Sequence, residues 1–189
     1  LIDCGVVVAA RMCLRRFTHA EVAKEAGVSV PTVFKHFANR RELVDAVIDS
    51  TKTFYLDIAR HWNRPEILGH TAIRGMLGAF VDSLDDHPHY AYVWLEWSIS
   101  INDEMGMWES FLDYQKQVLA MIGGSVRRAK QQGHAHPTIS ASVSSKLILA
   151  SAYTIIQLRF THKDRRVVNQ FMNQMLHLAL HDLPYEAGA

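Results

Sequence analysis

The chain has 189 residues, 49% of them hydrophobic, which is enough to bury a sizeable core in one domain or in a small and a larger domain. Its formal net charge of +1 excludes no class of partner. However, residues 1–41 hold seven Lys or Arg against three Asp or Glu, and the remainder is mildly acidic. Because phosphate attraction acts locally, a basic N-terminal part favours a polyanionic partner.

The cysteine and hydropathy patterns favour a cytoplasmic protein. Cys4 and Cys13 are too far apart on one helix to form a disulfide, which fits a reducing compartment. No apolar run approaches the length of about 20 residues that spans a bilayer, and no signal peptide is evident. The chain opens without Met inside an expected helix, so we expect further residues upstream of Leu1.

Four helices are predicted in the first third of the chain, over residues 1–13, 19–26, about 30–37 and 40–62. Thr18 can cap the second helix, with Glu21 completing a capping box. Gly27 can end that helix in a left-handed conformation. Ser29 can cap the third helix with Pro31 in its first turn, and Asn39 can cap the fourth.

Helical spacing also dominates the remainder, where strand signals are nearly absent. Further helices are predicted over about 66–86, 90–100, 108–132, 139–161 and 164–182. The fold class is therefore all-α with about nine helices. We expect a three-helix N-terminal domain at residues 1–45 and a helical ligand-binding and dimerisation domain at residues 46–189.

The second and third predicted helices form a helix-turn-helix candidate, because they are short and joined by a tight turn at Gly27. Ala23 is a small residue where the two helices would cross. The polar remainder of the third helix would face outward, where its beginning could enter a major groove. The alternative is an ordinary helical hairpin with a solvated face. The apolar residues expected to bury one face against the first helix are Val22, Val28, Val33, Phe34 and Phe37.

The stretch FTHAEVAKEAGVSVPTVFKHFANRRELVDAVID resembles the DNA-binding domain of the TetR family of transcriptional regulators. Shared features are the Gly-Val-Ser turn, Thr32, the aromatic pair Phe34 and Phe37, and a basic residue, Arg40, opening the next helix. A narrower resemblance, carried by VSVPTVFKHFANRRELVD and YVWLEWSISINDE, is to the HapR/LuxR-type branch of quorum-sensing regulators. The chain departs from that branch at several positions, so its operator sequence is not carried over: Cys13, Arg15, Pro31, Lys35 and His36.

The resemblance implies a homodimer that binds a pseudo-palindromic double-stranded DNA operator in the bacterial cytoplasm. It leaves open whether the protein represses or activates. Lys35 is the best candidate to read guanine, because Lys can donate to its O6 and N7 atoms. Matching DNA-binding positions are Thr18, Ser29, Pro31, Thr32, Lys35, His36 and Arg40.

The last two predicted helices are the expected dimer interface, since Ser and Ala permit close approach and the final helix carries a broad apolar stripe. Plain intramolecular core is the alternative, and the resemblance favours a four-helix interface. The expected interface residues are Ser151, Ile155, Val168, Phe171, Met175 and Leu178.

Aromatic and apolar residues of the body suggest a pocket for a small apolar effector, with ordinary core as the alternative. Glu96 lies between two tryptophans and needs a partner in such surroundings. The resemblance places Trp94 at the pocket wall, near Phe111 and Gln115. The candidate pocket residues are Met76, Phe80, Trp94, Glu96, Trp97, Phe111, Gln115 and Tyr153.

Other classes of function find less support in the sequence. Nucleophile-elbow, P-loop and dinucleotide motifs are missing, so we expect no enzyme and no cofactor. Among the eleven histidines, the pair His177 and His181 would share one helical face, but the glutamate of a zinc-protease helix does not follow His177 and no cysteine pair has ligand spacing, so we expect no metal site. The second hypothesis is a helical small-molecule-binding or adaptor protein without a DNA role, in which Thr32 and Lys35 would be dispensable.

Overall fold

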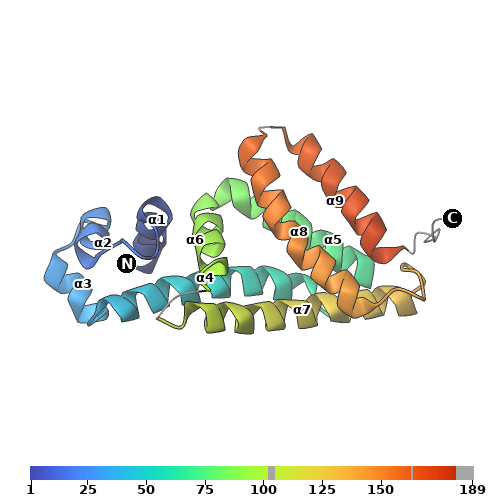
Figure 1. Cartoon of the computed structure of the whole chain (residues 1–189), viewed down its shortest axis with the longest axis horizontal. Helices are drawn as coiled ribbons and strands as arrows, with labels where there is room; N and C mark the ends of the chain where they lie inside the picture. The colour runs from blue at the N-terminus through green and yellow to red at the C-terminus, as the bar shows by residue number, and fades with distance from the viewer. Residues whose placement is uncertain (102–104, 163, 182–189) are drawn as a thin grey trace. The chain divides into compact units, whose positions relative to one another are not determined.

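Nine α-helices make up most of the residues that the computed structural model describes, which are 1–101, 105–162 and 164–181 (Figure 1). No strand occurs among these described residues, so the all-α prediction is confirmed. The helices are α1 (Ile2–Met12), α2 (His19–Ala26), α3 (Val30–His36), α4 (Arg40–Trp62), α5 (Gly69–Asp86), α6 (Pro88–Ser98), α7 (Met107–Gln131), α8 (Ala141–Thr161) and α9 (Arg165–Leu180).

Helix boundaries follow the local capping signals closely. Asn39 Oδ1 accepts a hydrogen bond from the Glu42 amide at 3.0 Å and so caps α4 as expected. Asp164 accepts from the Arg166 amide at 2.8 Å at the start of α9. The largest shift is at α5, which begins three residues later than predicted because the Ile67 amide donates to the Arg64 carbonyl in a turn.

The helices divide into two compact units. The first unit comprises Leu1–Leu56 with Leu84–Tyr114, and the second comprises Asp57–Ser83 with Gln115–Ala189. The division at residue 45 that the sequence suggested lies inside α4, and α6 groups with the N-terminal helices because it packs against α1. The assignment of separate roles to 1–45 and 46–189 stays a prediction.

The first unit has a continuous apolar core. Large buried side chains come from α1, from the segment between α1 and α2, and from α4, α6 and α7. Trp97 Nε1 donates to the Met107 carbonyl at 2.8 Å, so the indole has its polar group satisfied inside this core. The largest fully buried members are Val6, Val8, Leu14, Phe17, Leu43, Trp94, Trp97 and Phe111.

The second unit is built around the packing of α8 on α9, which lie side by side (Figure 1). Among the described helices, α8 alone has the length and mean hydropathy, 1.2, of a possible membrane span. The expectation from the sequence that no apolar run approaches the length of a membrane span is therefore wrong for α8. This finding is weak evidence for a membrane helix, because Ile148, Ile155 and Ile156 of α8 are buried inside the unit as in a soluble core.

Candidate nucleic-acid interface

The start of α2 carries the predicted capping box. Thr18 Oγ1 accepts from the Glu21 amide at 3.5 Å, and Glu21 Oε2 accepts from the Thr18 amide at 2.8 Å. These two bonds satisfy backbone donors that the first turn of any helix leaves unpaired. Thr18 itself remains exposed, so its hydroxyl is accessible from outside the first unit.

The turn between α2 and α3 has the predicted left-handed glycine. Gly27 has φ 67° and ψ 28°, and the Val28 amide donates to the Ala23 carbonyl at 3.0 Å. A residue with a Cβ is strained at this φ, whereas glycine is not. Ala23 is buried as expected, and α2 packs against α3.

Ser29 caps α3 and Pro31 lies in its first turn, both as predicted. Ser29 Oγ accepts from the Thr32 amide at 3.3 Å and lies 2.8 Å from Thr32 Oγ1. Because each hydroxyl has one donor and two acceptor positions, both can still bond to an incoming group. Val33 is fully buried and anchors this short helix.

The predicted burial of five apolar residues in α2, the turn and α3 was partly wrong. Val22 and Val33 are buried, but Val28 is 39% exposed, Phe34 is 46% exposed and Phe37 is half-buried. Only Val33 and Phe34 lie within α3, and consecutive residues of a helix point about 100° apart, so the face that buries Val33 leaves Phe34 toward solvent.

His19 is the residue of this region that sequence reasoning missed. Its buried ring stacks on Phe34, with ring centroids 4.0 Å apart and an interplanar angle of 3°. Its Nε2 atom also lies 2.9 Å from the Phe37 carbonyl oxygen. His19 therefore links the start of α2 to the C-terminal end of α3, and no local sequence signal reveals a contact of this kind.

Most of the predicted DNA-binding side chains lie on the surface of the first unit. Ser29, Pro31, Lys35 and His36 are exposed, and Thr32 is half-buried. Among the described residues, Lys35 has no carboxylate partner, so its charge is available to a phosphate or a base. The exposed Arg15 and Arg16, in the segment before α2, add positive charge to the same unit.

Arg40 and Glu96 have partners inside the first unit. Arg40 Nη2 donates to the Leu14 carbonyl at 2.7 Å, and Glu96 Oε2 accepts from the Leu14 amide at 2.6 Å. The backbone of Leu14, between α1 and α2, is thus held from α4 and from α6. A carboxylate beside tryptophans requires a polar partner, and the partner of Glu96 is the backbone amide of Leu14.

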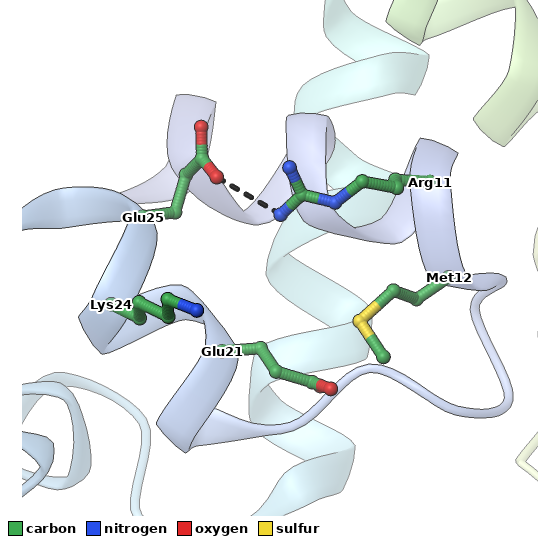
Figure 2. A pocket seen from close by; sticks show the side chains of 5 residues that line it. All are labelled: Arg11, Met12, Glu21, Lys24 and Glu25. Carbon is green, nitrogen blue, oxygen red and sulfur yellow. Dashed lines mark hydrogen bonds and ion pairs between the residues drawn. The ribbon is translucent and has the colours of Figure 1, made fainter.

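The outer side of α1 and α2 carries an ion pair beside a cavity of about 460 Å³. Figure 2 shows Arg11 and Glu25 pointing toward one another, and their closest atoms are 2.9 Å apart. Glu21, Lys24 and Met12 complete the lining. Because charges of both signs lie here, this cavity offers no surface selective for a polyanion.

The eight predicted pocket residues divide between the two units. Trp94, Trp97 and Phe111 are buried in the first unit, where the rings of Trp97 and Phe111 lie 5.2 Å apart, edge to face. This packing is that of a core. Met76, Phe80, Gln115 and Tyr153 belong to the second unit, where Met76 is buried and the other three are half-buried. A ligand pocket formed by these residues stays a prediction.

The six predicted interface residues also differ in exposure. Ser151, Ile155, Val168 and Met175 are buried within one chain, so they support the packing of the second unit itself. Phe171 is half-buried and Leu178 is 52% exposed, and a dimer interface at the six residues stays a prediction. Among the described residues, no group of three or more His, Cys, Asp or Glu side chains is placed to hold a metal ion.

Comparisons with known proteins match this architecture. Residues 5–47 match the family model described as bacterial regulatory proteins, tetR family. Residues 5–47 are therefore similar to the N-terminal domain of TetR family regulators. The predicted resemblance is thereby confirmed, and the TetR-type helix-turn-helix corresponds to α2, the Gly27 turn and α3.

One sequence relative and two solved structures extend the similarity beyond residues 5–47. The HTH-type transcriptional regulator LuxR of Vibrio harveyi is 28% identical over 133 residues, which cover 70% of this chain. The match spans 64% of the length of that LuxR protein. The transcriptional regulator FadR of Bacillus subtilis, solved in complex with stearoyl-CoA, has a TM-score of 0.76 at 16% identity, covering 95% of each chain.

A third relative is PfmR of Thermus thermophilus, a TetR family transcriptional regulator. Its TM-score is 0.72 at 12% identity, with 93% of this chain and 92% of PfmR covered. At such identities the structural likeness shows a shared fold. The TetR-like fold, with an N-terminal helix-turn-helix and a helical C-terminal part, is thus established for the chain.

Proposed function

We propose that this chain is a transcriptional regulator that binds a pseudo-palindromic DNA operator as a homodimer. The observation that carries the proposal is the capped α2–turn–α3 motif within the TetR-type domain, with Lys35 and His36 exposed on α3. A helix-turn-helix places the beginning of its second helix against base edges while neighbouring polar groups contact phosphates.

The charge of the N-terminal part supports a DNA partner. Two of its three carboxylates are engaged within α1 and α2, because Glu21 belongs to the capping box and Glu25 pairs with Arg11. Lys35, Arg15 and Arg16 are exposed and lack a carboxylate partner among the described residues. Net positive charge on a surface without such pairing favours phosphate binding through release of counterions.

Selection of bound duplexes from random DNA tests the proposal, and a pseudo-palindromic sequence should be enriched. We expect Lys35→Ala to weaken binding and to relax the preference at one base position by roughly 1–3 kcal/mol, because a lost base contact removes discrimination. Thr32→Ala should weaken binding more evenly across sequences. Titration of the selected duplex at two salt concentrations measures both effects.

Lys116→Ala is the matched control, because Lys116 is an exposed lysine of α7 in the second unit. It removes the same charge and should leave base preference unchanged. A selection without any enriched palindrome would contradict the proposal. That outcome would favour a helical small-molecule-binding or adaptor protein without a DNA role.

The proposed dimer uses apolar side chains that α8 and α9 leave exposed. On α8, Val143 is 65% exposed and Leu147 is 42% exposed, and they are four residues apart on one helix face. On α9, Phe171 and Leu178 recur seven residues apart, again on one face. An apolar stripe on each of two packed helices is suited to pairing with a second copy in a four-helix arrangement.

Leu178→Glu and Leu147→Glu should each weaken the dimer about tenfold or more, because burial of a carboxylate against apolar side chains is unfavourable. Sedimentation over a concentration series measures the dissociation constant. Leu112→Glu is the control, since Leu112 is an exposed leucine of α7 in the first unit. A monomeric wild-type chain, or an equal effect of the control, would contradict this interface.

The effector and the physiological role are further parts of the proposal. Because FadR of Bacillus subtilis was solved with stearoyl-CoA, a small apolar or amphipathic effector is a reasonable candidate here. It would act only if it bound the DNA-competent and DNA-incompetent forms with different affinity. A role in quorum sensing, in the bacterial cytoplasm, rests on the similarity to LuxR of Vibrio harveyi.

A further inference from the structure

A cavity of about 450 Å³ in the second unit gathers four histidines and an arginine. His70 and Arg74 come from α5, His134 from the turn after α7, and His177 and His181 from the end of α9. The rings form two pairs: His70 and His134 have centroids 4.1 Å apart, and His177 and His181 have centroids 4.9 Å apart. Ring pairs this close bring their charges together whenever both partners are protonated.

Arg74 brings a positive charge to the cavity that its described lining does not neutralise. No Asp or Glu is among the lining residues, which besides Arg74 and the four histidines are Gly133, Asn173, Leu176 and Leu180. Arg74 Nη1 donates at 2.7 Å to Asn173 Oδ1, a neutral amide. By contrast, several arginines of the second unit pair with carboxylates: Arg60, Arg64, Arg165 and Arg166.

His70 shows the electrostatic consequence of this arrangement. Its Nδ1 atom is buried without a hydrogen-bond partner among the described residues, and its Nε2 atom lies 3.3 Å from Thr71 Oγ1. Burial lowers the pKa of His70 below its usual value, and the nearby His134 and Arg74 lower it further. Repulsion between like charges accounts for the last two contributions, and a bound anion would relieve it.

Histidines that are merely solvated would be expected to lie apart on the surface, because charged imidazoles repel one another. The four histidines of this cavity instead converge from three separate elements. A metal is a poorer occupant, because the described residues include no group of three or more His, Cys, Asp or Glu side chains that are placed to hold a metal ion. Leu176 and Leu180 supply an apolar wall beside Arg74 and the histidines.

We propose that this cavity is a binding site for a small organic anion, whose carboxylate or phosphate lies among Arg74 and the two histidine pairs. Its apolar part would contact Leu176 and Leu180. The volume is within the range of small-molecule sites. This site is independent of DNA binding, since all its residues belong to the second unit and none is among the pocket residues expected from the sequence.

Calorimetric titration of the full chain tests the site with three probes at about pH 6 and about pH 8, at constant ionic strength. Butyrate and its neutral isostere butanamide differ in charge, and inorganic phosphate separates phosphate from carboxylate recognition. We expect butyrate, phosphate or both to bind, and butanamide to bind at least tenfold more weakly. Because protonated imidazoles attract the anion, affinity should fall about tenfold or more between the lower and the higher pH.

Arg74→Gln and His134→Gln should each weaken anion binding about tenfold or more. Two cavity variants are used so that a local folding defect in one of them does not decide the result. His162→Gln is the matched control, because His162 is an exposed histidine of the second unit outside the cavity. Equal binding of butyrate and butanamide would overturn the proposal. So would unchanged affinity in both cavity variants, or tight binding of Zn²⁺ together with no binding of either anion.

Discussion

Gly69→Ala is expected to lower the free energy of unfolding by about 1–3 kcal/mol or more, the largest single effect we predict on stability. A Cβ at residue 69 would lie 2.3 Å from the Ala129 amide nitrogen and 2.3 Å from the Ser125 carbonyl oxygen. Both atoms belong to the backbone of α7, so neither can rotate away as a side chain would. The substitution must therefore move the start of α5 away from α7. This movement also lengthens the hydrogen bond that the Gly69 amide donates to Gln132 Oε1 at 2.8 Å.

Gly78→Ala is the matched control on the same helix. No atom lies within 4 Å of a Cβ built there, so alanine fits without displacement. Because glycine in a helix interior is less favourable than alanine, this variant should be more stable by about 0.5–1 kcal/mol. Chemical denaturation of both variants measures the difference. Two variants of equal stability would show that α5 and α7 do not approach as closely at Gly69 as described.

Glu96→Ala should destabilise the first unit by about 1–3 kcal/mol, because it removes the acceptor of a buried backbone amide. Leu14 is only 1% exposed, so water cannot readily replace the carboxylate that accepts from its amide at 2.6 Å. Glu96→Gln keeps an uncharged acceptor and should lose less. Amide hydrogen exchange at Leu14 reports on this bond directly, and exchange should be faster in Glu96→Ala than in the wild type.

The same variant connects the helical body to the proposed DNA-binding function. Leu14 precedes α2, and Arg40 at the start of α4 holds its carbonyl. Loosening this segment should weaken operator binding even though Glu96 touches no DNA in the proposal. Asp49→Ala, which removes an exposed carboxylate from α4, should change stability by less than about 0.5 kcal/mol. Unchanged exchange at Leu14 in Glu96→Ala would show that the carboxylate does not hold that amide.

Much of the local structure of the candidate interface could be predicted from the sequence. The capping box at Thr18, the left-handed Gly27 and the cap at Ser29 are all found as expected. The exposure of Val28 and Phe34 was predicted wrongly. Helical spacing indicates which residues share a face, but it does not tell how much of that face a neighbouring helix covers.

The partner of Glu96 shows a second limit. The sequence indicates that a carboxylate between Trp94 and Trp97 needs a partner, but it does not identify that partner. The observed partner is a backbone amide 82 positions away. Every residue carries a backbone amide, so residue identity provides no signal for such a pair.

The sequence by itself determined most helix boundaries to within about three residues and the two short helices that flank the Gly27 turn. Caps, turns and helical periodicity depend on residues within about four positions of one another, so a linear pattern contains them. Only the tertiary structure decided that Phe34 rests on His19, that Glu96 holds Leu14, and that the histidines of α5, α9 and the turn after α7 share one cavity. These contacts join residues distant in the chain, and the packing of whole helices sets them.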